Sequence, residues 1–209
     1  MKLSQSRAVR ASALVLTTAL LVAPAAAVGA TAVHRDRSND VKRAIDGGRA
    51  RSVILLIGDG MGDSEITIAR NYQVGAAGRL ALDTLPLTGV MTTYSVLKND
   101  PATPDYDPES ASTGSAWATG HKTYDGAISV LPDGRPAPTI LELAKRAGYR
   151  TGNVTTAEIQ DATPAVLVSH VVSRTCKGPD TMAACPAQDA AAGGPGSISE
   201  QLLATRPDV

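Results

Sequence analysis

The acidic residue Asp59 has surroundings that suit a bound metal ion. It follows the continuous apolar run 53–57 and lies among three glycines in the string GDGMG. Such a run is typical of a strand covered on both faces, which would place Asp59 at the carboxyl edge of a sheet, where open α/β folds bind ligands. The spacing matches neither a dinucleotide fingerprint nor a P-loop, so we favour a metal. Capping of the helix expected from Ile66 is the alternative.

Ser110 is the second candidate, because it begins a run of small residues, SASTGSAWAT, over 110–119. A helix that starts there points free backbone N–H groups and its positive dipole end at the space beside Ser110, which is a ready anion site. Plain capping of that helix is the alternative. Asp161 and Thr163 stand just before Pro164 in a similar setting, and each is also a candidate N-cap of the helix that follows.

The charge distribution limits the classes of partner. The chain has 20 Lys and Arg against 20 Asp and Glu, but residues 1–52 hold nine basic and three acidic residues. Residues 53–209 therefore hold eleven basic and seventeen acidic residues, a net charge of −6. This balance argues against a nucleic-acid partner. Affinity for phosphate would have to come from a local site, through metal ions or one or two arginines.

The N-terminal segment has the pattern of a secretory signal peptide. Basic residues precede the apolar stretch 11–22, and small residues then offer cleavage points near Ala27, Ala30 or Ala32. The stretch is too short for a comfortable membrane span, so we expect no stable membrane anchor, a retained anchor being the alternative. The sequence thus predicts a secreted or periplasmic protein.

The two cysteines fit this prediction. Cys176 and Cys185 form an even pair, and such a pair in an exported chain most often makes a disulfide. A metal-binding pair is the alternative, but the C-x-x-C spacing and nearby histidines are lacking. We therefore expect a disulfide next to Arg174.

The periodicity of the sequence predicts an α/β fold. We expect strands over 53–57, 87–95 and 150–156, helices over 66–72, 139–147 and 164–171, a loop over 98–109, and a further helix after 197–200. Asp63 or Ser64 is expected to cap the first helix. Thr139 with Glu142, and Ser197 with Glu200, have the spacing of capping boxes. The strand–helix–strand order predicts a parallel sheet with right-handed crossovers.

Taken together, these motifs resemble the alkaline phosphatases. The strings ILLIGDGMGDSEIT, SASTGSAWATGHKTYDGA, TILELAKRAGYRTGNVTTAEIQDATPA and SHVVSRTCKGP occur in the order of that family, over about residues 53–209. The resemblance implies a three-layer sandwich with a mostly parallel central sheet, incomplete in this chain. It divides the chain into a signal peptide (1–30), a flexible entry segment (31–52) and the N-terminal part of the phosphatase domain (53–209). Phosphate monoesters and inorganic phosphate are the implied ligands, and a homodimer is compatible with it for the full-length protein.

The resemblance also assigns roles to the candidate residues. Ser110 corresponds to the nucleophile that is transiently phosphorylated and also binds zinc, and Arg174 to the arginine that grips two phosphate oxygens. Without the family, Arg174 would be interpreted as a surface charge. Asp59, Asp161 and Thr163 match a magnesium-type site, with Asp161 acting through bound water.

Departures from the family pattern affect both the acid beside the nucleophile and the metal sites. Glu109 precedes Ser110 where many bacterial members have Asp. Its extra methylene is expected to alter how the acid orients Arg174. Glu109 and Arg174 are both candidates for substrate binding. Lys122 is covered by the likeness, whereas His121 is a local variant. The family's cofactors are two Zn²⁺ ions and one Mg²⁺ ion, and their remaining ligands come from a C-terminal half not present in these residues.

We therefore expect the 209-residue chain alone to be inactive. Only three histidines occur, and none matches a zinc position. A fragment that binds phosphate or metal without turnover is one alternative function. Another hydrolase of the metal-dependent phosphatase and sulfatase superfamily is a second, although no C/S-x-P-x-R string surrounds Ser110 as a sulfatase requires.

Overall fold

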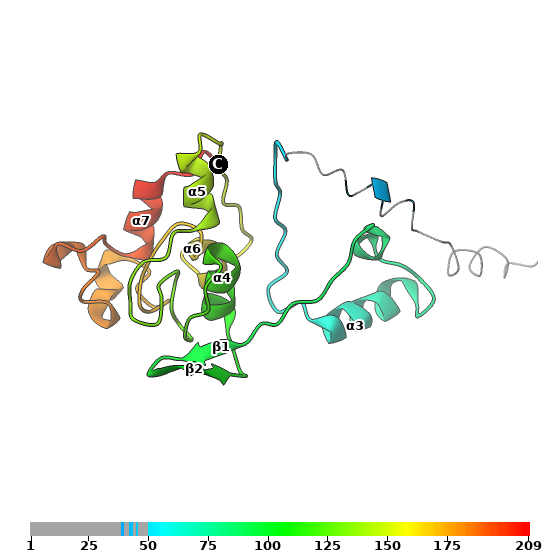
Figure 1. The fold of residues 1–209 in the computed structure, drawn as a ribbon, viewed down its shortest axis with the longest axis horizontal. Coiled ribbons are helices and arrows are strands. Elements are labelled where there is room, and N and C mark those ends of the chain that lie inside the picture. Colours follow the sequence, from blue (N-terminus) through cyan, green and yellow to red (C-terminus); the bar gives the residue numbers. More distant parts are fainter. Residues whose placement is uncertain (1–38, 40–41, 44, 46–49) are drawn as a thin grey trace, which may run out of the picture. The chain divides into compact units, whose positions relative to one another are not determined.

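The computed structural model describes residues 39, 42–43, 45 and 50–209, which belong to two compact units. The described part of the first unit is chiefly Gly62–Thr88, and the second unit comprises Ser52–Met61 with Gly89–Val209 (Figure 1). The expected signal peptide and most of the expected entry segment lie outside the described residues. Among the residues that the structure describes, no helix combines the length and apolar character needed to cross a bilayer.

The first unit contains helix α3, Asp63–Val74, at the place where the sequence predicts a helix. Its N-cap is Gly62, and no side chain caps it, so the expectation that Asp63 or Ser64 does so is wrong. Asp63 and Glu65 lie instead in the first turn, where acidic side chains interact favourably with the helix dipole.

An ion pair joins α3 to the short 3-10 helix η1, Ala81–Thr84, in the same unit. Arg70 donates from Nη2 and Nε to both carboxylate oxygens of Asp83, at 2.7 and 2.8 Å. This two-point contact fixes both side chains. Hydrogen bonding from Arg70 lowers the pKa of the Asp83 carboxyl to about 2.

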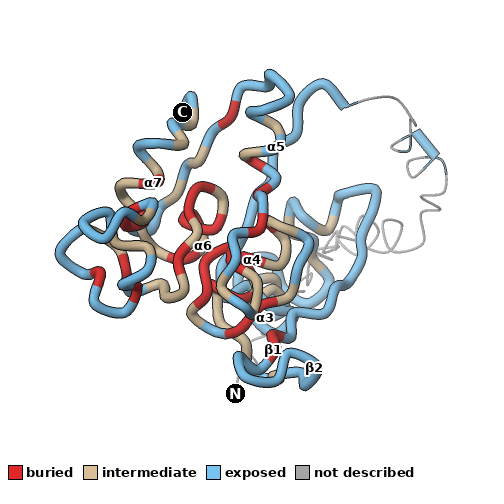
Figure 2. Tube along the Cα trace, turned by 60° about the vertical axis from the view of Figure 1, so that its left-hand side comes forward, coloured by how far each residue is buried: buried red, intermediate tan, exposed pale blue. Residues whose placement is uncertain are grey.

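The second unit contains most of the regular structure. Its elements are β1 (Ser95–Leu97), β2 (Asp100–Asp105), α4 (Ser110–Thr119), α5 (Ile140–Arg146), α6 (Ala162–Ala165), η2 (Pro179–Ala184), η3 (Ala190–Ala192) and α7 (Ile198–Thr205). Helix α4 contacts both α5 and α6, and buried residues gather around α4 and α6 (Figure 2).

Small side chains on α4 allow this close packing. A Cβ atom added to Gly114 would lie only 3.1 Å from Cγ1 of Val166, which directly follows α6. The expectation that the small residues let the helix approach a neighbour therefore holds, although the neighbour here is α6 rather than a sheet. The buried cluster consists of Ala111, Ala118, Ile128, Ala162, Ala165, Val166, Val171, Cys176, Met182, Cys185 and Ile198.

The helix expected over 164–171 is much shorter than predicted. α6 ends at Ala165, because side chains from other segments satisfy the carbonyl groups that follow. Ser129 Oγ donates to Val166 O at 2.5 Å, Thr139 Oγ1 to Leu167 O at 2.7 Å, and Thr205 Oγ1 to Val168 O at 3.0 Å. By contrast, both predicted capping boxes are present, with Thr139 and Ser197 as the N-caps of α5 and α7.

The region 98–109 contains a strand, so its prediction as a loop throughout is wrong. β1 and β2 pair antiparallel, with Ser95 opposite Asp105 and Val96 opposite Pro104. A two-stranded sheet has only edge strands, and an edge strand tolerates proline because one side of it needs no N–H donor. This is the only named sheet among the described residues.

The strand predicted over 53–57 is not formed. Its five side chains are 41–88% exposed, and no backbone hydrogen bond joins it to another described segment. A strand is stable only with a partner for its N–H and C=O groups, which explains the difference. Most of the strand expected over 87–95 is likewise absent, since β1 begins only at Ser95.

The segment 150–156 is also not assigned as a strand, but it makes backbone contacts of a parallel kind. Asn153 N donates to Val209 O at 2.8 Å, while Thr151 O accepts from Val209 N at 3.2 Å and from Asp208 N at 2.7 Å. The N–H and the C=O of Val209 thus bond to Thr151 and Asn153, the two residues that flank Gly152. Neighbouring parallel strands have this pattern. Among the described residues the structure goes no further towards the expected three-layer sandwich.

Candidate functional site

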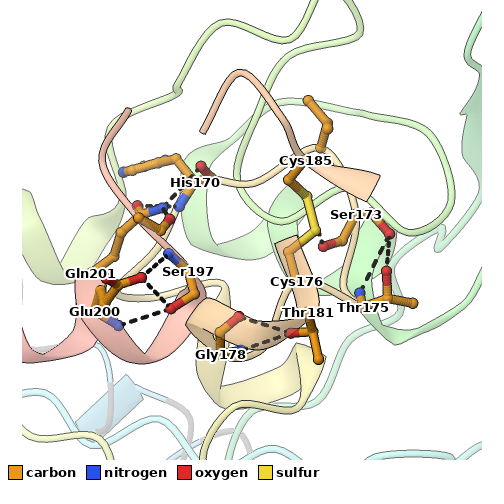
Figure 3. The surroundings of a disulfide bond; sticks show 12 residues. His170, Ser173, Thr175, Cys176, Gly178, Thr181, Cys185, Ser197, Glu200 and Gln201 are labelled. Carbon is orange, nitrogen blue, oxygen red and sulfur yellow. Dashed lines mark hydrogen bonds between the residues drawn. A yellow bond between two sulfur atoms is a disulfide. The ribbon is translucent and has the colours of Figure 1, made fainter. Parts of the chain in front are cut away.

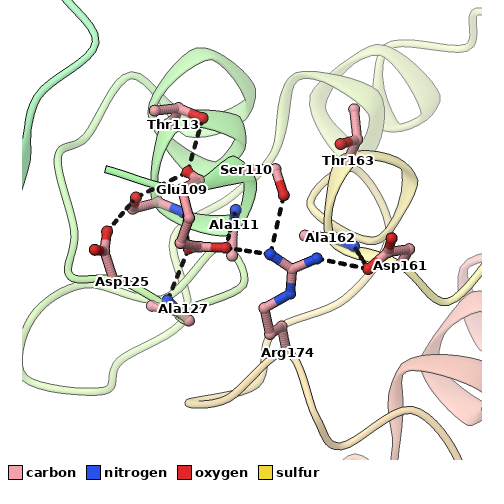
Figure 4. A network of polar contacts seen from close by, with 12 residues as sticks. Glu109, Ser110, Ala111, Thr113, Asp125, Ala127, Asp161, Ala162, Thr163 and Arg174 are labelled. Carbon is pink, nitrogen blue, oxygen red and sulfur yellow. Dashed lines mark hydrogen bonds and ion pairs between the residues drawn. The ribbon is translucent and has the colours of Figure 1, made fainter. Parts of the chain in front are cut away.

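Ser110 is the first residue of α4, and its side chain does not cap the helix. Glu109 is the N-cap, and its carboxylate accepts hydrogen bonds from Ala111 N at 2.9 Å and Ser112 N at 3.0 Å (Figure 4). The alternative in which Ser110 is only a capping residue is therefore wrong. The Ser110 hydroxyl remains available for chemistry at the positive end of the helix dipole.

Glu109 is held as a carboxylate by a dense set of donors. Besides the two helix N–H groups, Gly126 N donates to its Oε1 at 2.8 Å, and Arg174 Nη1 donates to its Oε2. Burial raises the pKa of the Glu109 carboxyl, but the three backbone donors and Arg174 outweigh this effect and hold the pKa below its ordinary value. The site therefore contains a fixed negative charge next to Ser110.

Arg174 brings the predicted site residues together. Its Nη1 donates to Ser110 Oγ at 3.0 Å as well as to Glu109, and its Nη2 donates to Asp161 Oδ1 at 2.7 Å (Figure 4). Its side chain is 31% exposed, so solvent and ligands can reach the guanidinium. Burial lowers the pKa of Arg174, but the hydrogen bonds to Asp161 and Glu109 raise it above its ordinary value. Arg174 is therefore always a cation here.

Asp161 has two roles in the structure. It is the N-cap of α6, accepting from Ala162 N at 2.9 Å, and it is an ion-pair partner of Arg174. The hydrogen bond from Arg174, followed by that from Ala162 N, lowers the pKa of the Asp161 carboxyl. The capping alternative for Asp161 is thus correct, and it coexists with a place in the site.

Asp59 and Thr163 lie side by side although 104 residues separate them in the sequence. Thr163 Oγ1 donates to Asp59 Oδ2 at 2.5 Å. A hydroxyl and a carboxylate oxygen this close suit a hard cation such as Mg²⁺. Asp161, the N-cap of α6, lies two residues before Thr163 in the sequence.

Asp59 and Thr163 offer only oxygen atoms, the ligand type of hard cations such as Mg²⁺. A catalytic zinc site needs about three protein ligands, usually His, Asp, Glu or Cys. Within the described part of the chain, no three such side chains are grouped so that they could hold a metal ion. The described residues therefore complete neither a zinc site nor a magnesium site, although the oxygens of Asp59 and Thr163 are of the type that magnesium prefers.

The predicted disulfide is present. Cys176 and Cys185 are bonded, with their Cα atoms 6.3 Å apart, and both residues are fully buried (Figure 3). Cys176 follows Arg174 by two residues, and its carbonyl accepts from Ile198 N at 3.0 Å. The disulfide thus ties the segment that carries Arg174 to the hydrophobic core, and the metal-pair alternative is excluded.

Two lysines near the predicted motifs have defined partners, and only Lys177 contacts a site residue. Lys122 Nζ donates to Tyr94 O at 2.6 Å and lies 4.1 Å from the centre of the Tyr94 ring, and burial lowers its pKa. Lys177 was not singled out from the sequence. Its Nζ lies 2.5 Å from Glu158 Oε2 and 4.0 Å from Asp161 Oδ1, which adds a second cation near Arg174. Only its position directly after Cys176, three residues beyond Arg174, could have indicated this.

Comparison with known proteins agrees with this geometry. A family model described as alkaline phosphatase matches residues 50–209. The chain is 55% identical over 196 residues to streptomycin-6-phosphate phosphatase of Streptomyces griseus and 52% identical over 183 residues to alkaline phosphatase of Escherichia coli K12. Among solved structures, Thermus thermophilus alkaline phosphatase matches 72% of this chain and 28% of its own, with a TM-score of 0.54 and 29% identity.

A second solved structure, cold-active alkaline phosphatase from the psychrophile Shewanella sp., matches 56% of this chain and 29% of its own, with a TM-score of 0.51 and 36% identity. These neighbours support an α/β fold. The match to the Streptomyces protein spans 93% of this chain but only 41% of that protein. The match to the E. coli protein spans 87% of this chain and 39% of that protein. With the family model matched over residues 50–209 and these identities beside it, the chain belongs to the alkaline phosphatase family.

Proposed function

We propose that the protein hydrolyses phosphate monoesters through a phosphoserine formed on Ser110. The observation that carries this proposal is the 3.0 Å contact between Ser110 Oγ and Arg174 Nη1 at the N-terminus of α4. The hydroxyl oxygen would lose its proton and attack phosphorus, and the bond between phosphorus and the alcohol oxygen would break, with the alcohol leaving in protonated form. Water would later attack the phosphoserine, releasing inorganic phosphate and returning a proton to the serine oxygen. The helix N-terminus and the guanidinium both favour the negative charge of the phosphoryl group.

The other site residues have distinct parts in this proposal. Glu109 and Asp161 hold the two ends of the Arg174 guanidinium, so that it is already oriented before phosphate arrives. Asp59 and Thr163 would contribute oxygen ligands to one Mg²⁺ ion, and Ser110 and Asp59 would contribute to Zn²⁺ binding. Bound zinc supplies a lower pKa for the serine hydroxyl and stabilisation of developing negative charge. Two zinc ions and one magnesium ion are the proposed complement.

The proposal extends to the whole protein. Its domain would be a three-layer α/β sandwich, of which 53–209 form one part. The parallel hydrogen bonds between Thr151, Asn153 and Val209 support this arrangement. The disulfide supports export after signal cleavage, because such bonds persist in oxidising compartments. A homodimer of the full-length protein is also part of the proposal.

Phosphate binding without turnover is the second candidate function for the 209 residues taken alone. It is favoured by the lack of a three-ligand metal group among the described residues. We propose that this chain, purified with zinc and magnesium, hydrolyses p-nitrophenyl phosphate no faster than its Ser110→Ala variant.

Turnover kinetics test the main proposal. The protein would be expressed from its complete reading frame and assayed with p-nitrophenyl phosphate as wild type, Ser110→Ala and Arg174→Ala. We expect Ser110→Ala to abolish turnover, and Arg174→Ala to raise the inhibition constant for inorganic phosphate while retaining partial activity. Full activity of Ser110→Ala would refute the assigned nucleophile.

A further inference from the structure

A tight turn at Tyr124–Ala127 links the two segments that carry Ser110 and Arg174. Ala127 N donates to Tyr124 O at 3.2 Å, and Gly126 adopts a φ of 87°. Only glycine adopts this conformation readily, because other residues meet a steric clash at their Cβ atom. The turn has none of the roles proposed above, yet Asp125 and Ala127 lie beside Glu109 at the start of α4 (Figure 4).

On the side of α4, the turn is held by three hydrogen bonds. Gly126 N donates to Glu109 Oε1 at 2.8 Å. Ser112 Oγ, in a residue that is 1% exposed, donates to Asp125 Oδ1 at 2.7 Å. Ser115 Oγ donates to Ala127 O at 2.9 Å. The position of the turn is thereby fixed against the first two turns of the helix.

On the other side, the turn holds the backbone of Arg174. Gly126 O accepts from Arg174 N at 2.6 Å. Beyond the turn, the two segments remain hydrogen-bonded to each other. Ile128 N donates to Val171 O at 2.9 Å, and Val171 N donates to Ile128 O at 3.1 Å. Gly126 therefore bonds to Glu109 with its donor and to Arg174 with its acceptor.

These contacts close a ring of hydrogen bonds. One oxygen of the Glu109 carboxylate accepts from Gly126, whose carbonyl accepts from the Arg174 backbone, and the Arg174 guanidinium returns to the other oxygen of Glu109. The ring fixes both ends of a long, flexible side chain relative to the same carboxylate. Neither the guanidinium contacts nor the backbone contacts alone would do so.

We propose that Asp125 and Gly126 are positioning residues that set the guanidinium of Arg174 at bonding distance from Ser110. The inference rests on the proposed function, and it adds residues that touch neither phosphate nor metal. Ser112 acts as the link that keeps Asp125, and with it the turn, against the helix. A shift of the turn would move the Arg174 backbone, because Gly126 O accepts directly from Arg174 N.

Two glycine variants separate positioning from stability, in the protein expressed from its complete reading frame. Gly126 and Gly148 have nearly equal φ values, 87° and 84°, and at neither does an added Cβ meet an atom within 4 Å. Gly126→Ala and Gly148→Ala thus place a Cβ atom at a similar positive φ, but Gly148 follows the C-cap of α5 and its N–H bonds to Lys145 O rather than to a site residue. We expect kcat/KM to fall roughly tenfold to a hundredfold in Gly126→Ala alone, with a matching rise in the inhibition constant for inorganic phosphate.

A second pair of variants tests the link from Ser112. Asp125→Asn keeps an oxygen that can accept from Ser112 Oγ, whereas Asp125→Ala does not. We expect Asp125→Ala to weaken phosphate inhibition and Asp125→Asn to retain it. Equal effects of Gly126→Ala and Gly148→Ala, or of Asp125→Ala and Asp125→Asn, would overturn the positioning role. If Ser110→Ala left turnover intact, the proposed function itself would have failed, which is a distinguishable result.

Discussion

Replacing Glu109 with Ala should open the start of α4 without disturbing the other helices. The change removes the acceptor of Ala111 N, Ser112 N and Gly126 N, which lie 2.8–3.0 Å from the carboxylate. Loss of an N-cap costs about 1 kcal/mol, and leaving the Gly126 donor without its charged partner costs roughly another 1–2 kcal/mol. The ion pair with Arg174 adds at most about 1 kcal/mol, because both side chains are 31% exposed and therefore screened.

These contributions total roughly 2–4 kcal/mol, which corresponds to a loss of about thirtyfold to several hundredfold in amide protection. Hydrogen exchange followed by mass spectrometry would measure it on peptides that cover 110–119. Glu200→Ala is the matched control, because Glu200 serves the capping box of α7, where its carboxylate accepts from Ser197 N and Ser197 Oγ. Unchanged exchange over 110–119 in Glu109→Ala, or an equal change in the control, would refute the reasoning.

The same carboxylate also predicts a pH dependence. Its folded pKa is lower than its unfolded value, so its contribution to stability is present above the unfolded pKa, about 4.3, and is lost as the pH falls through the folded value. Protection over 110–119 should therefore decline in acid in the wild type more steeply than in Glu109→Gln. Parallel acid profiles of the two proteins would contradict this assignment.

Three further predictions concern the surrounding structure. Arg174→Lys should raise the inhibition constant for inorganic phosphate roughly tenfold or more, since one ammonium cannot span Glu109 and Asp161 as the guanidinium fork does; an unchanged constant would argue against bidentate binding. Reduction of the Cys176–Cys185 bond should lower the free energy of unfolding by about 2–3 kcal/mol, measured by urea titration with and without reductant. Thr139→Ala should destabilise by about 1–2 kcal/mol by the same titration, because the buried hydroxyl caps α5 and also bonds Leu167 O.

Features that depend on local chemistry could be predicted from the sequence. The capping boxes at Thr139 and Ser197 formed as expected, because both partners lie within four residues of each other. The disulfide was predicted from the cysteine count together with the expected export. The small residues of 110–119 correctly indicated a closely packed helix, and its first residue is Ser110.

Features that depend on residues distant in the sequence could not be predicted from it. The apolar run 53–57 predicts a strand, but its backbone makes no hydrogen bond to another segment among the described residues. The end of α6 is decided by hydroxyls of Ser129, Thr139 and Thr205, which no local pattern of 164–171 reveals. Glu109 is the N-cap of α4 in place of Ser110, and its carboxylate also accepts from Gly126 N, 17 residues further along the chain.

The central claim is that Ser110 carries the phosphoryl group, and trapping that group tests it most directly. The protein expressed from its complete reading frame, supplied with zinc and magnesium, would be mixed with p-nitrophenyl phosphate, quenched in acid and digested. Mass spectrometry should then find acid-stable phosphate on Ser110 in the wild type and none in Ser110→Ala. Phosphate on Ser112 or Ser115 instead, or steady turnover with no phosphoserine on the 110–119 peptide, would contradict the account.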